Sequence, residues 1–188
     1  MKQEFLREFF EKYIEGTPEK AIVADRKMFL CHLTKAVMKG IDIDGSIKSV
    51  YVTSRCVKHL YDKKPAEEFL FIINYLHKIV KYPDEIYKNL TGKRGDFCFV
   101  KTIKNEKYFC TIEIIKIPSS VCGITELGAS KLGASLATEE IHVATAFRLR
   151  KEKYEKYIKN YTLLWDWGNG NPHRSALDTP KESTNAPQ

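Results

Sequence analysis

The spacing of apolar residues changes once along this chain, and that change limits the folds it can adopt. Before Pro83 most apolar residues recur every three or four positions, as in an amphipathic helix; after Pro83 they alternate with polar residues, as in a half-buried strand. Helices followed by a run of strands are typical of an α+β fold. The longest apolar runs are far shorter than the roughly twenty residues that span a membrane, so we expect no membrane segment. Acidic residues interrupt the N-terminal segment, so we expect no signal peptide and a cytoplasmic protein.

The first half of the chain is predicted to be mainly helical. An amphipathic helix covers residues 2–15, and Thr17-Pro18 is typical of the start of a second helix that runs to about Lys39. We expect these two helices to form an N-terminal helical hairpin that occupies residues 1–45. The remaining predicted elements of this half are a strand over residues 47–53, a short helix over 54–62 and a helix over 65–82.

The second half is predicted to form a meander of strands, over residues 86–89, 97–103, 108–117 and 141–147. Residues 119–140, which contain a doubled Leu-Gly-Ala-Ser, are predicted to be an inserted, mobile loop with about one helical turn. A charged helix over residues 151–158 follows, and Leu163–Trp165 is expected to pack back on the fold. Residues 166–188 lack periodicity and are predicted to be a disordered tail, which leaves residues 46–165 as the main domain.

Positive charge is concentrated in that main domain. The net charge of the chain is +7, yet residues 1–45 are neutral and residues 166–188 carry a slight negative excess. Residues 46–165 hold 21 basic and 13 acidic residues, so the whole positive excess lies there. A localised basic excess favours a polyanionic partner such as RNA, although a merely soluble basic protein would have the same composition.

The five cysteines give no sign of a disulfide or a metal centre. Their number is odd and no two are spaced as Cys-x-x-Cys, so we expect free, partly buried thiols in a reducing compartment. The chain also lacks His-x-x-x-His and His-Glu-x-x-His, and its glycine-rich segment lacks the Gly-Lys-Ser/Thr of a nucleotide-binding loop. We therefore expect neither a metal ion nor a cofactor.

His59 is the first candidate for chemistry. On the predicted helix Arg55 and Lys63 lie four residues to either side of it, so the three share one exposed, cationic face, with Lys58 adjacent in sequence. Nearby positive charge favours the neutral imidazole, which can accept a proton near pH 7. The alternative is an ordinary surface histidine.

The last predicted strand supplies a second candidate group. If Ile141 and Val143 face the helices, strict alternation places His142 and Arg148 together on the open face, which suits a phosphate or a base. Thr145 would then face the helices, and a β-bulge would be needed to turn its hydroxyl outward. The open face could equally be no more than a solvated surface.

Three further cations, Lys93, Arg94 and Lys101, lie in the predicted turn and strand around residue 95. Lysine and arginine can hold a phosphate and stabilise the charge on a transferring phosphoryl group. A charged hairpin tip is also commonly just a solvated turn, so both interpretations stay open.

Several segments, in this order, resemble the phage-associated nuclease domains that are grouped with barnase, EndoU, the tRNase colicins and RelE. They span about residues 46–165. The segments are Val52–Ser54, Val57–Lys63, Tyr82–Tyr87, Gly95–Lys101, and Ala144–Arg148 with the Lys151–Tyr157 helix. The resemblance implies an α+β fold in which helices pack on one face of a small, mostly antiparallel four-stranded sheet.

The resemblance also implies a function: a metal-independent endoribonuclease, toxin-like or phage-derived, in which the ribose 2′-OH attacks the adjacent phosphate. His59 matches the family's helix histidine and would be the acid or base. Thr145 matches a threonine of the final strand, and Lys101 matches a basic residue of a middle strand. Charge and position add further residues that would bind an RNA such as a tRNA or mRNA: Arg55, Lys58, Lys63, Lys93, Arg94, His142 and Arg148.

The N-terminal hairpin has no counterpart in that family, so residues 1–45 could bind an inhibitor or another partner protein. Two further hypotheses stay open: an RNA-binding module that no longer cuts, and a phage or prophage interaction protein that retains the fold. Cleavage in EDTA that His59→Ala abolishes would identify the nuclease. Salt-sensitive RNA affinity without cleavage would identify the RNA-binding module, and the absence of both would identify the interaction protein.

Overall fold

A computed structural model describes residues 2–43, 46–91, 95–117, 138–167 and 171–172 of the chain. Within them one mixed sheet of eight strands runs through the molecule in the order β1-β2-β6-β5-β4-β3-β7-β8. β2 and β6 are parallel, and every other neighbouring pair is antiparallel. The strands are β1 (Lys27–His32), β2 (Ser49–Thr53), β3 (Glu85–Asn89), β4 (Phe97–Ile103), β5 (Glu106–Ile117), β6 (Thr138–Leu149), β7 (Tyr161–Asp166) and β8 (Asn171–Pro172).

The protein is α+β, but its sheet is not the small four-stranded one expected from the sequence. The four strands predicted after Pro83 form the contiguous block β6-β5-β4-β3, while β1 and β2 extend it on one side and β7 and β8 on the other. The sequence does not predict β7 as a strand because Leu163–Trp165 is a run of adjacent apolar residues rather than an alternation. Antiparallel pairing with β3 makes this segment a strand.

The predicted N-terminal helical hairpin is wrong. α1 (Lys2–Tyr13) forms as expected, but the residues predicted as the second helix contain the strand β1 and only a short helix, α2 (Lys35–Gly40). β1 pairs along its length with β2, so a partner further along the chain overrides the local helical spacing. Thr34 begins α2, because its Oγ1 accepts a hydrogen bond from the Val37 backbone at 3.3 Å.

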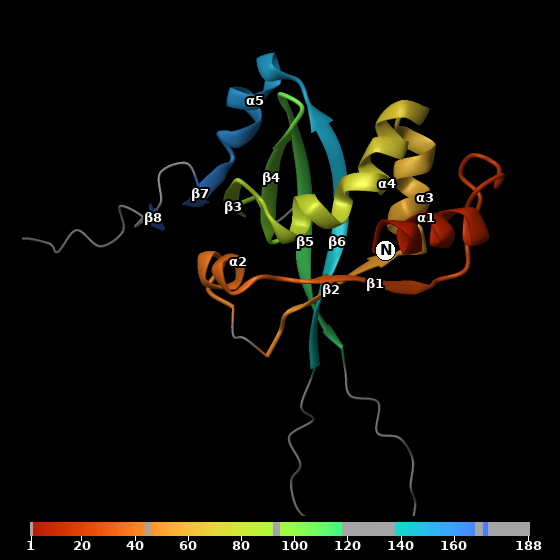
Figure 1. Ribbon diagram of the computed structural model, residues 1–188, viewed down its shortest axis with the longest axis horizontal. Coiled ribbons are helices and arrows are strands. Elements are labelled where there is room, and N and C mark those ends of the chain that lie inside the picture. The colour runs from red at the N-terminus through yellow and green to blue at the C-terminus, as the bar shows by residue number, and fades with distance from the viewer. Residues whose placement is uncertain (1, 44–45, 92–94, 118–137, 168–170, 173–188) are drawn as a thin grey trace, which may run out of the picture.

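Three helices, α1, α3 (Ser54–Lys63) and α4 (Ala66–Lys81), lie on one face of the sheet (Figure 1). α3 begins where the Oγ1 of Thr53 accepts a hydrogen bond from the Cys56 backbone at 3.2 Å. α4 follows Pro65 and carries Glu67 and Glu68 in its first turn, where the helix dipole favours negative charge. The buried side chains of α4 belong to the main apolar core between these helices and the sheet: Phe69, Ile72, Ile73, Leu76, Ile79 and Val80.

α5 (Lys151–Ile158) lies on the opposite face, so helices cover both faces of the sheet rather than one. None of its residues is fully buried. Tyr154 and Tyr157 pack on a smaller apolar core that includes Tyr87, Phe109 and Leu149. α5 covers the end of this face near the β4–β5 turn, and within the described residues no helix covers the end formed by β1 and β2 (Figure 1).

A β-bulge interrupts the alternation of β6. Thr111 pairs with Thr145, whereas the next residue of β5, Ile112, pairs with Val143. Val143 and Ala146 are both buried in the main core although they are three positions apart, an odd spacing that strict alternation would place on opposite faces. The side-chain alternation therefore changes phase between them. The bulge therefore reverses the orientation that strict alternation predicts for the rest of the strand.

Thr145 and Arg148 show the consequence of that bulge. Thr145 faces away from α3 and α4, as the sequence would allow only with a bulge. Arg148 pairs with Tyr108, a residue of the main core, and therefore lies on the face that α1, α3 and α4 cover. Its backbone N–H donates to Glu68 at 3.1 Å and its guanidinium to Glu106 at 3.0 Å. The prediction that Arg148 shares a face with His142 is therefore wrong.

The four cysteines of the described residues are free and buried, as the sequence predicts: Cys31, Cys56, Cys98 and Cys110. Burial raises the pKa of the Cys56 thiol to about 12 and the pKa of Cys110 well above its ordinary range. Buried thiols that stay protonated are poor nucleophiles. Cys56 and Cys110 are therefore no candidates for chemistry, and Cys122 lies outside the described residues.

Two predicted segments lie largely outside the described residues. Of the loop predicted over residues 119–140, only Thr138–Glu140 are described, and they form the start of β6. Of the tail predicted over residues 166–188, Asp166 ends β7 and the short strand β8 pairs with β7. Trp167 is also described, whereas residues 119–137, 168–170 and 173–188 lie outside the described residues.

Candidate functional site

Side chains from β1, β2 and β6 gather on the sheet face opposite α1, α3 and α4. Phe29 pairs with Tyr51, and Tyr51 pairs with His142 across the parallel contact of β2 and β6. Their sequence neighbours Val52 and Val143 are buried in the main core, so these three side chains point the other way. The outer-face cluster is the set Lys27, Phe29, His32, Tyr51, Glu140 and His142.

Four rings follow one another across this cluster. The distances between ring centroids are 4.8 Å from His32 to Phe29, 6.0 Å from Phe29 to Tyr51 and 5.9 Å from Tyr51 to His142. Phe29 is 40% exposed and His32 is exposed, so one end of the row is open to solvent. The ammonium of Lys27 lies 4.7 Å from the centroid of the Tyr51 ring. Aromatic rings beside a cation form a surface on which nucleic-acid bases can stack.

The opposite end of the row is a charged triplet of His142, Glu140 and Lys27. The His142 Nε2 lies 2.9 Å from a Glu140 oxygen, and the Lys27 Nζ donates to both Glu140 oxygens at 2.7 Å. Burial alone would raise the pKa of Glu140, but the hydrogen bonds from Lys27 and His142 outweigh it and hold the pKa below its ordinary 4.5. Glu140 is therefore an anion at neutral pH.

The charge of Glu140 determines which nitrogen of His142 carries a proton. An ionised carboxylate only accepts hydrogen bonds, so the His142 Nε2 must donate one. In the neutral imidazole the other nitrogen, Nδ1, then holds a lone pair that can take up a proton. A base that a neighbouring carboxylate orients is the arrangement that activates hydroxyl groups for attack in many enzymes. Glu113 of β5 pairs with His142 and adds a second, half-buried carboxylate on this face.

The structure does not bring His59, Lys101 and Thr145 into one site. His59 is exposed on α3, on the same face of the sheet as α1 and α4. Lys101 pairs with Tyr108 and so faces the same side, but its ammonium forms an ion pair with Asp84 just after α4. Thr145 faces the opposite side. The three residues that the family resemblance assigns to catalysis therefore cannot close on a single phosphodiester in this arrangement.

The other cations predicted to bind RNA have different surroundings. Lys58 is only 4% exposed, and its ammonium donates to Asp62 and, at 2.7 Å, to the Pro18 carbonyl. It is therefore a structural ion-pair residue and does not reach a ligand in solvent. Arg55 and Lys63 are exposed on α3 as expected. Lys93 and Arg94 lie outside the described residues.

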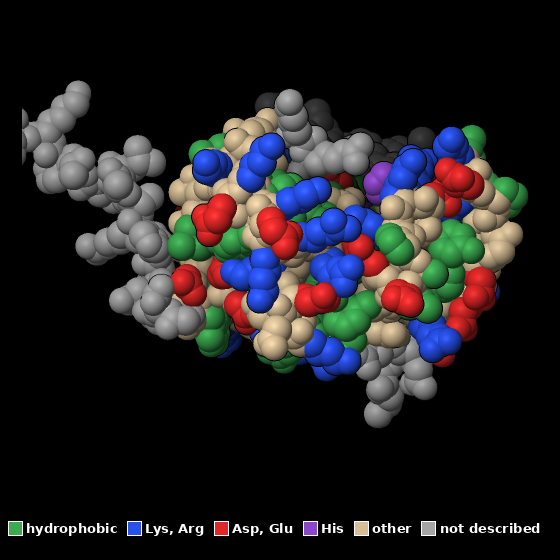
Figure 2. Space-filling view, turned by 90° about the horizontal axis from the view of Figure 1, so that it is seen from above, with side chains coloured by type: hydrophobic (Ala, Val, Ile, Leu, Met, Phe, Trp, Pro, Cys, Tyr) green, Lys and Arg blue, Asp and Glu red, His purple; other side chains and the backbone are tan. Residues whose placement is uncertain are grey.

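A second surface, the basic end surface, lies where β6 ends and α5 begins. Figure 2 looks onto this end of the molecule and shows Lys and Arg side chains with Asp and Glu side chains between them. Phe147 and Tyr157 lie among the cations, and Glu106 and Glu152 are the acidic residues that border them. The basic residues of this surface are Lys104, Arg148, Arg150, Lys151, Lys153 and Lys156.

The sequence predicts the strands that carry His142 and Tyr51, but not the rest of the outer-face cluster. It predicts a helix over Lys27, Phe29 and His32, and a loop over Glu140. Met28–Cys31 is a run of adjacent apolar residues, which fits a strand or a helix, so the local pattern carries no signal that separates the two there.

Comparisons with known proteins identify no relative, since no family model, no curated protein and no solved structure matches the chain. Across the described part of the chain, every helix is too short or too polar to cross a membrane. The same part of the chain contains no cluster of three or more His, Cys, Asp or Glu side chains that could hold a metal ion.

Proposed function

We propose that this chain is a metal-independent endoribonuclease and that His142, rather than His59, transfers the proton. The triplet of His142, Glu140 and Lys27 beside a row of aromatic rings carries the proposal. The resemblance to phage-associated nuclease domains supports the same reaction, although it assigns other residues to it.

The reaction needs a base, an acid and a positive charge. The His142 Nδ1 takes the proton of the ribose 2′-OH as the O2′–P bond forms and the P–O5′ bond breaks. The imidazolium then returns the proton to the departing O5′. The products are a cyclic phosphate and a free 5′-hydroxyl group. Glu140 orients the ring and stabilises the imidazolium. The ammonium of Lys27 offsets the negative charge that accumulates on the phosphate.

The rings and the basic end surface supply the binding energy. Tyr51 and Phe29 offer flat faces on which two bases can stack, each worth about 1–3 kcal/mol. Phe147, on the basic end surface, is five residues from His142 along β6, which corresponds to roughly 15 Å of strand. One short RNA strand can therefore contact both regions, with its backbone on the cations and its bases on the rings.

The test is the cleavage of a single-stranded RNA in EDTA by the wild type, His142→Ala and His59→Ala. We expect His142→Ala to lower the cleavage rate by about 10²- to 10⁴-fold, which is the usual contribution of a general base. His59→Ala is the matched control, because it removes an exposed imidazole on the other side of the sheet. Retention of activity in His142→Ala with loss in His59→Ala would show that His59 on α3, and not His142, transfers the proton.

A second candidate function is RNA binding without cleavage, and the basic end surface favours it. In that case wild type binds RNA but leaves it intact, and the affinity falls steeply with salt. Replacing Arg150 and Lys153 by alanine should then weaken binding to all sequences and lower the salt dependence by about one unit per lost phosphate contact. Salt-independent affinity would contradict a backbone-binding role for this surface.

A further inference from the structure

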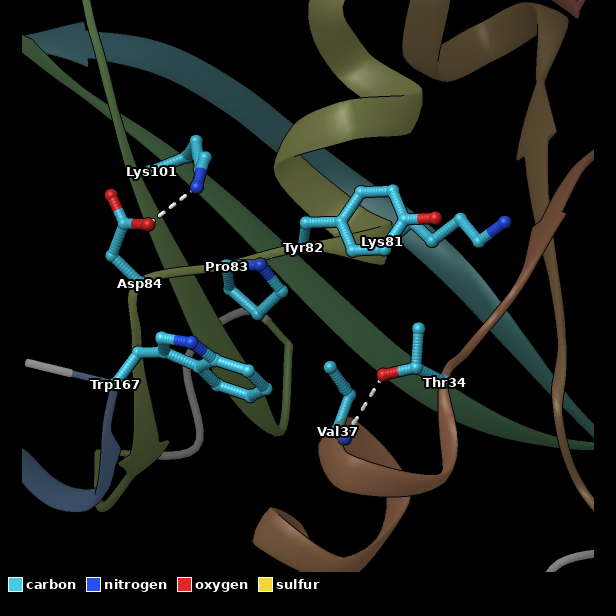
Figure 3. A pocket seen from close by; sticks show the side chains of 8 residues that line it. All are labelled: Thr34, Val37, Lys81, Tyr82, Pro83, Asp84, Lys101 and Trp167. Carbon is cyan, nitrogen blue, oxygen red and sulfur yellow. Dashed lines mark hydrogen bonds and ion pairs between the residues drawn. The ribbon is translucent and has the colours of Figure 1, made fainter. Parts of the chain in front are cut away.

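A cavity of about 160 Å³ lies between α2, the end of α4 and the segment after β7. Figure 3 shows Trp167 and Tyr82 on either side of Pro83, with Val37 and Thr34 beneath them. The backbone N–H of Trp167 donates to the Asp84 carbonyl at 2.8 Å, which fixes the tryptophan at the mouth. The residues that line the cavity are Thr34, Val37, Lys81, Tyr82, Pro83, Asp84, Lys101 and Trp167.

The walls of the cavity suit a flat aromatic ring. Tyr82 is 53% exposed and Trp167 is 58% exposed, although both are large apolar side chains that normally pack inside. An engineered apolar cavity of about 150 Å³ holds benzene in another protein, so this space accommodates one aromatic ring. The second ring of a bicyclic ligand would lie at the open mouth of the cavity, where Tyr82 and Trp167 are exposed.

The ion pair of Lys101 and Asp84 determines which edge of such a ring can face the cavity wall. The Lys101 ammonium and the Asp84 carboxylate form an ion pair at the cavity wall, and the second Asp84 oxygen accepts from the Thr102 backbone at 2.7 Å. Each carboxylate oxygen has two lone pairs, so Asp84 can accept further hydrogen bonds, and the ammonium has donors to spare. The wall therefore offers acceptors and a donor side by side.

We propose that this cavity binds an unpaired guanine base. Guanine carries two adjacent N–H donor groups beside a carbonyl acceptor, so Asp84 can accept both donors while Lys101 donates to the carbonyl. Adenine, cytosine and uracil present no adjacent pair of donors to the carboxylate. The positive charge of Lys81, beside Tyr82, favours the phosphate of a nucleotide at the mouth.

The site is separate from the proposed cleavage site. Lys101 is on the face of the sheet that α1, α3 and α4 cover, whereas the outer-face cluster is on the opposite face. The inference therefore does not depend on cleavage. A free guanine nucleotide and an unpaired guanine of an RNA strand share the same ring chemistry, so the experiment has one arm for each source.

The experiment measures binding by calorimetry of GMP, AMP, CMP and UMP, and of a six-nucleotide oligouridine with and without one guanine. We expect GMP, the guanine-containing RNA or both to bind at least tenfold more tightly than their counterparts, because a well-matched bidentate contact discriminates bases by that order. Trp167→Ala and Tyr82→Ala should each weaken binding by about 5- to 150-fold, the usual loss of one stacking ring. Asp84→Asn should remove the preference for guanine.

The matched control is Phe5→Ala, which removes an equally exposed ring (57%) from α1 and should leave guanine binding unchanged. Thermal unfolding of every variant shows whether it remains folded. Because Asp84 also bonds the Thr102 backbone, Lys101→Gln provides an independent test of the polar edge. Equal affinity for all four bases, or full guanine binding in both Trp167→Ala and Tyr82→Ala, would overturn the proposal.

Discussion

The two faces of the sheet are stabilised in different ways. On the face covered by α1, α3 and α4, the core consists of apolar side chains such as Phe99, Leu76 and Ile79, all fully buried. On the other face the apolar core is small, and polar contacts hold the elements together. The proposed catalytic groups lie on that second face, where the Lys27 side chain is 42% exposed, Glu140 is 19% exposed and His142 is buried.

The attachment of α5 illustrates the polar face. The carboxylate of Glu85 accepts hydrogen bonds from Tyr154, from Tyr87 at 2.6 Å and from Lys107 at 2.6 Å. Burial alone would raise the pKa of Glu85, but the bonds from Lys107 and the two tyrosines outweigh it and lower the pKa below 4.5. The Lys107 ammonium also lies 3.7 Å from the centroid of the Tyr154 ring. A partly buried anion thus takes the place that apolar packing has on the other face.

The largest expected effect is on the apolar face. Phe99→Ala should lower the free energy of unfolding by about 3–5 kcal/mol, because it leaves a large cavity in a fully buried position. Urea denaturation measures this loss. Phe29→Ala on the outer face is the matched variant, and it should cost about 1 kcal/mol or less, since that ring is partly exposed and its removal leaves no enclosed void. Equal losses would show that the two faces do not differ as described.

The next largest effect tests the attachment of α5. Tyr154→Phe removes one donor to the Glu85 carboxylate and should cost about 1.5–3 kcal/mol, the range for hydrogen bonds to charged groups. Tyr161→Phe removes a neutral hydrogen bond to Tyr157, 3.3 Å long, and should cost less than about 1 kcal/mol. Chemical denaturation of both variants gives the difference. If Tyr154→Phe is neutral, apolar packing rather than Glu85 holds the helix.

The sequence predicted the interior of the molecule better than its edges. α3, α4 and the strands from β3 to β6 were all expected, because each carries a strong local period: Ile72, Leu76 and Val80 repeat helically, while Phe97 and Phe99 alternate. β1 and β7 were not expected as strands, since adjacent apolar residues fit either structure and only a long-range partner decides between them. The four-stranded sheet was instead what the family resemblance implied, because the local pattern alone predicts five strands.

The candidate site was harder to predict than the fold. His142 was placed correctly on the face away from the helices, because it precedes the bulge. The orientation predicted for Arg148 is wrong because one extra residue in the strand reverses the orientation of every side chain beyond it. No residue type in this segment indicates a β-bulge. Glu140 and Lys27 are far apart in sequence and meet only because β2 pairs in parallel with β6 and antiparallel with β1.

The smallest expected effect tests the charged triplet of the outer face. The pKa of Glu140 is lowered in the folded protein, so its ionisation contributes stability above pH 4.5 that is lost as the pH falls through the lowered pKa. Glu140→Gln should therefore lower the free energy of unfolding by about 0.2–1 kcal/mol at pH 7, as expected for a partly exposed ion pair. The difference from wild type should shrink towards zero in acid, well below pH 4.5.

Measuring that difference, rather than the acid stability itself, isolates Glu140 from the other carboxylates with lowered pKa values, Glu85, Asp62 and Glu106, which titrate in both proteins. Glu139→Gln is the control, because Glu139 lies 3.9 Å from the exposed Lys116 and should contribute almost nothing. Urea unfolding between pH 7 and pH 3 gives both curves. A difference that grows in acid would mean that Glu140 is not held as an anion by Lys27 and His142, and His142 would then have no carboxylate to fix its tautomer. Glu140 would then no longer select Nδ1 as the nitrogen of His142 that accepts a proton on the outer face.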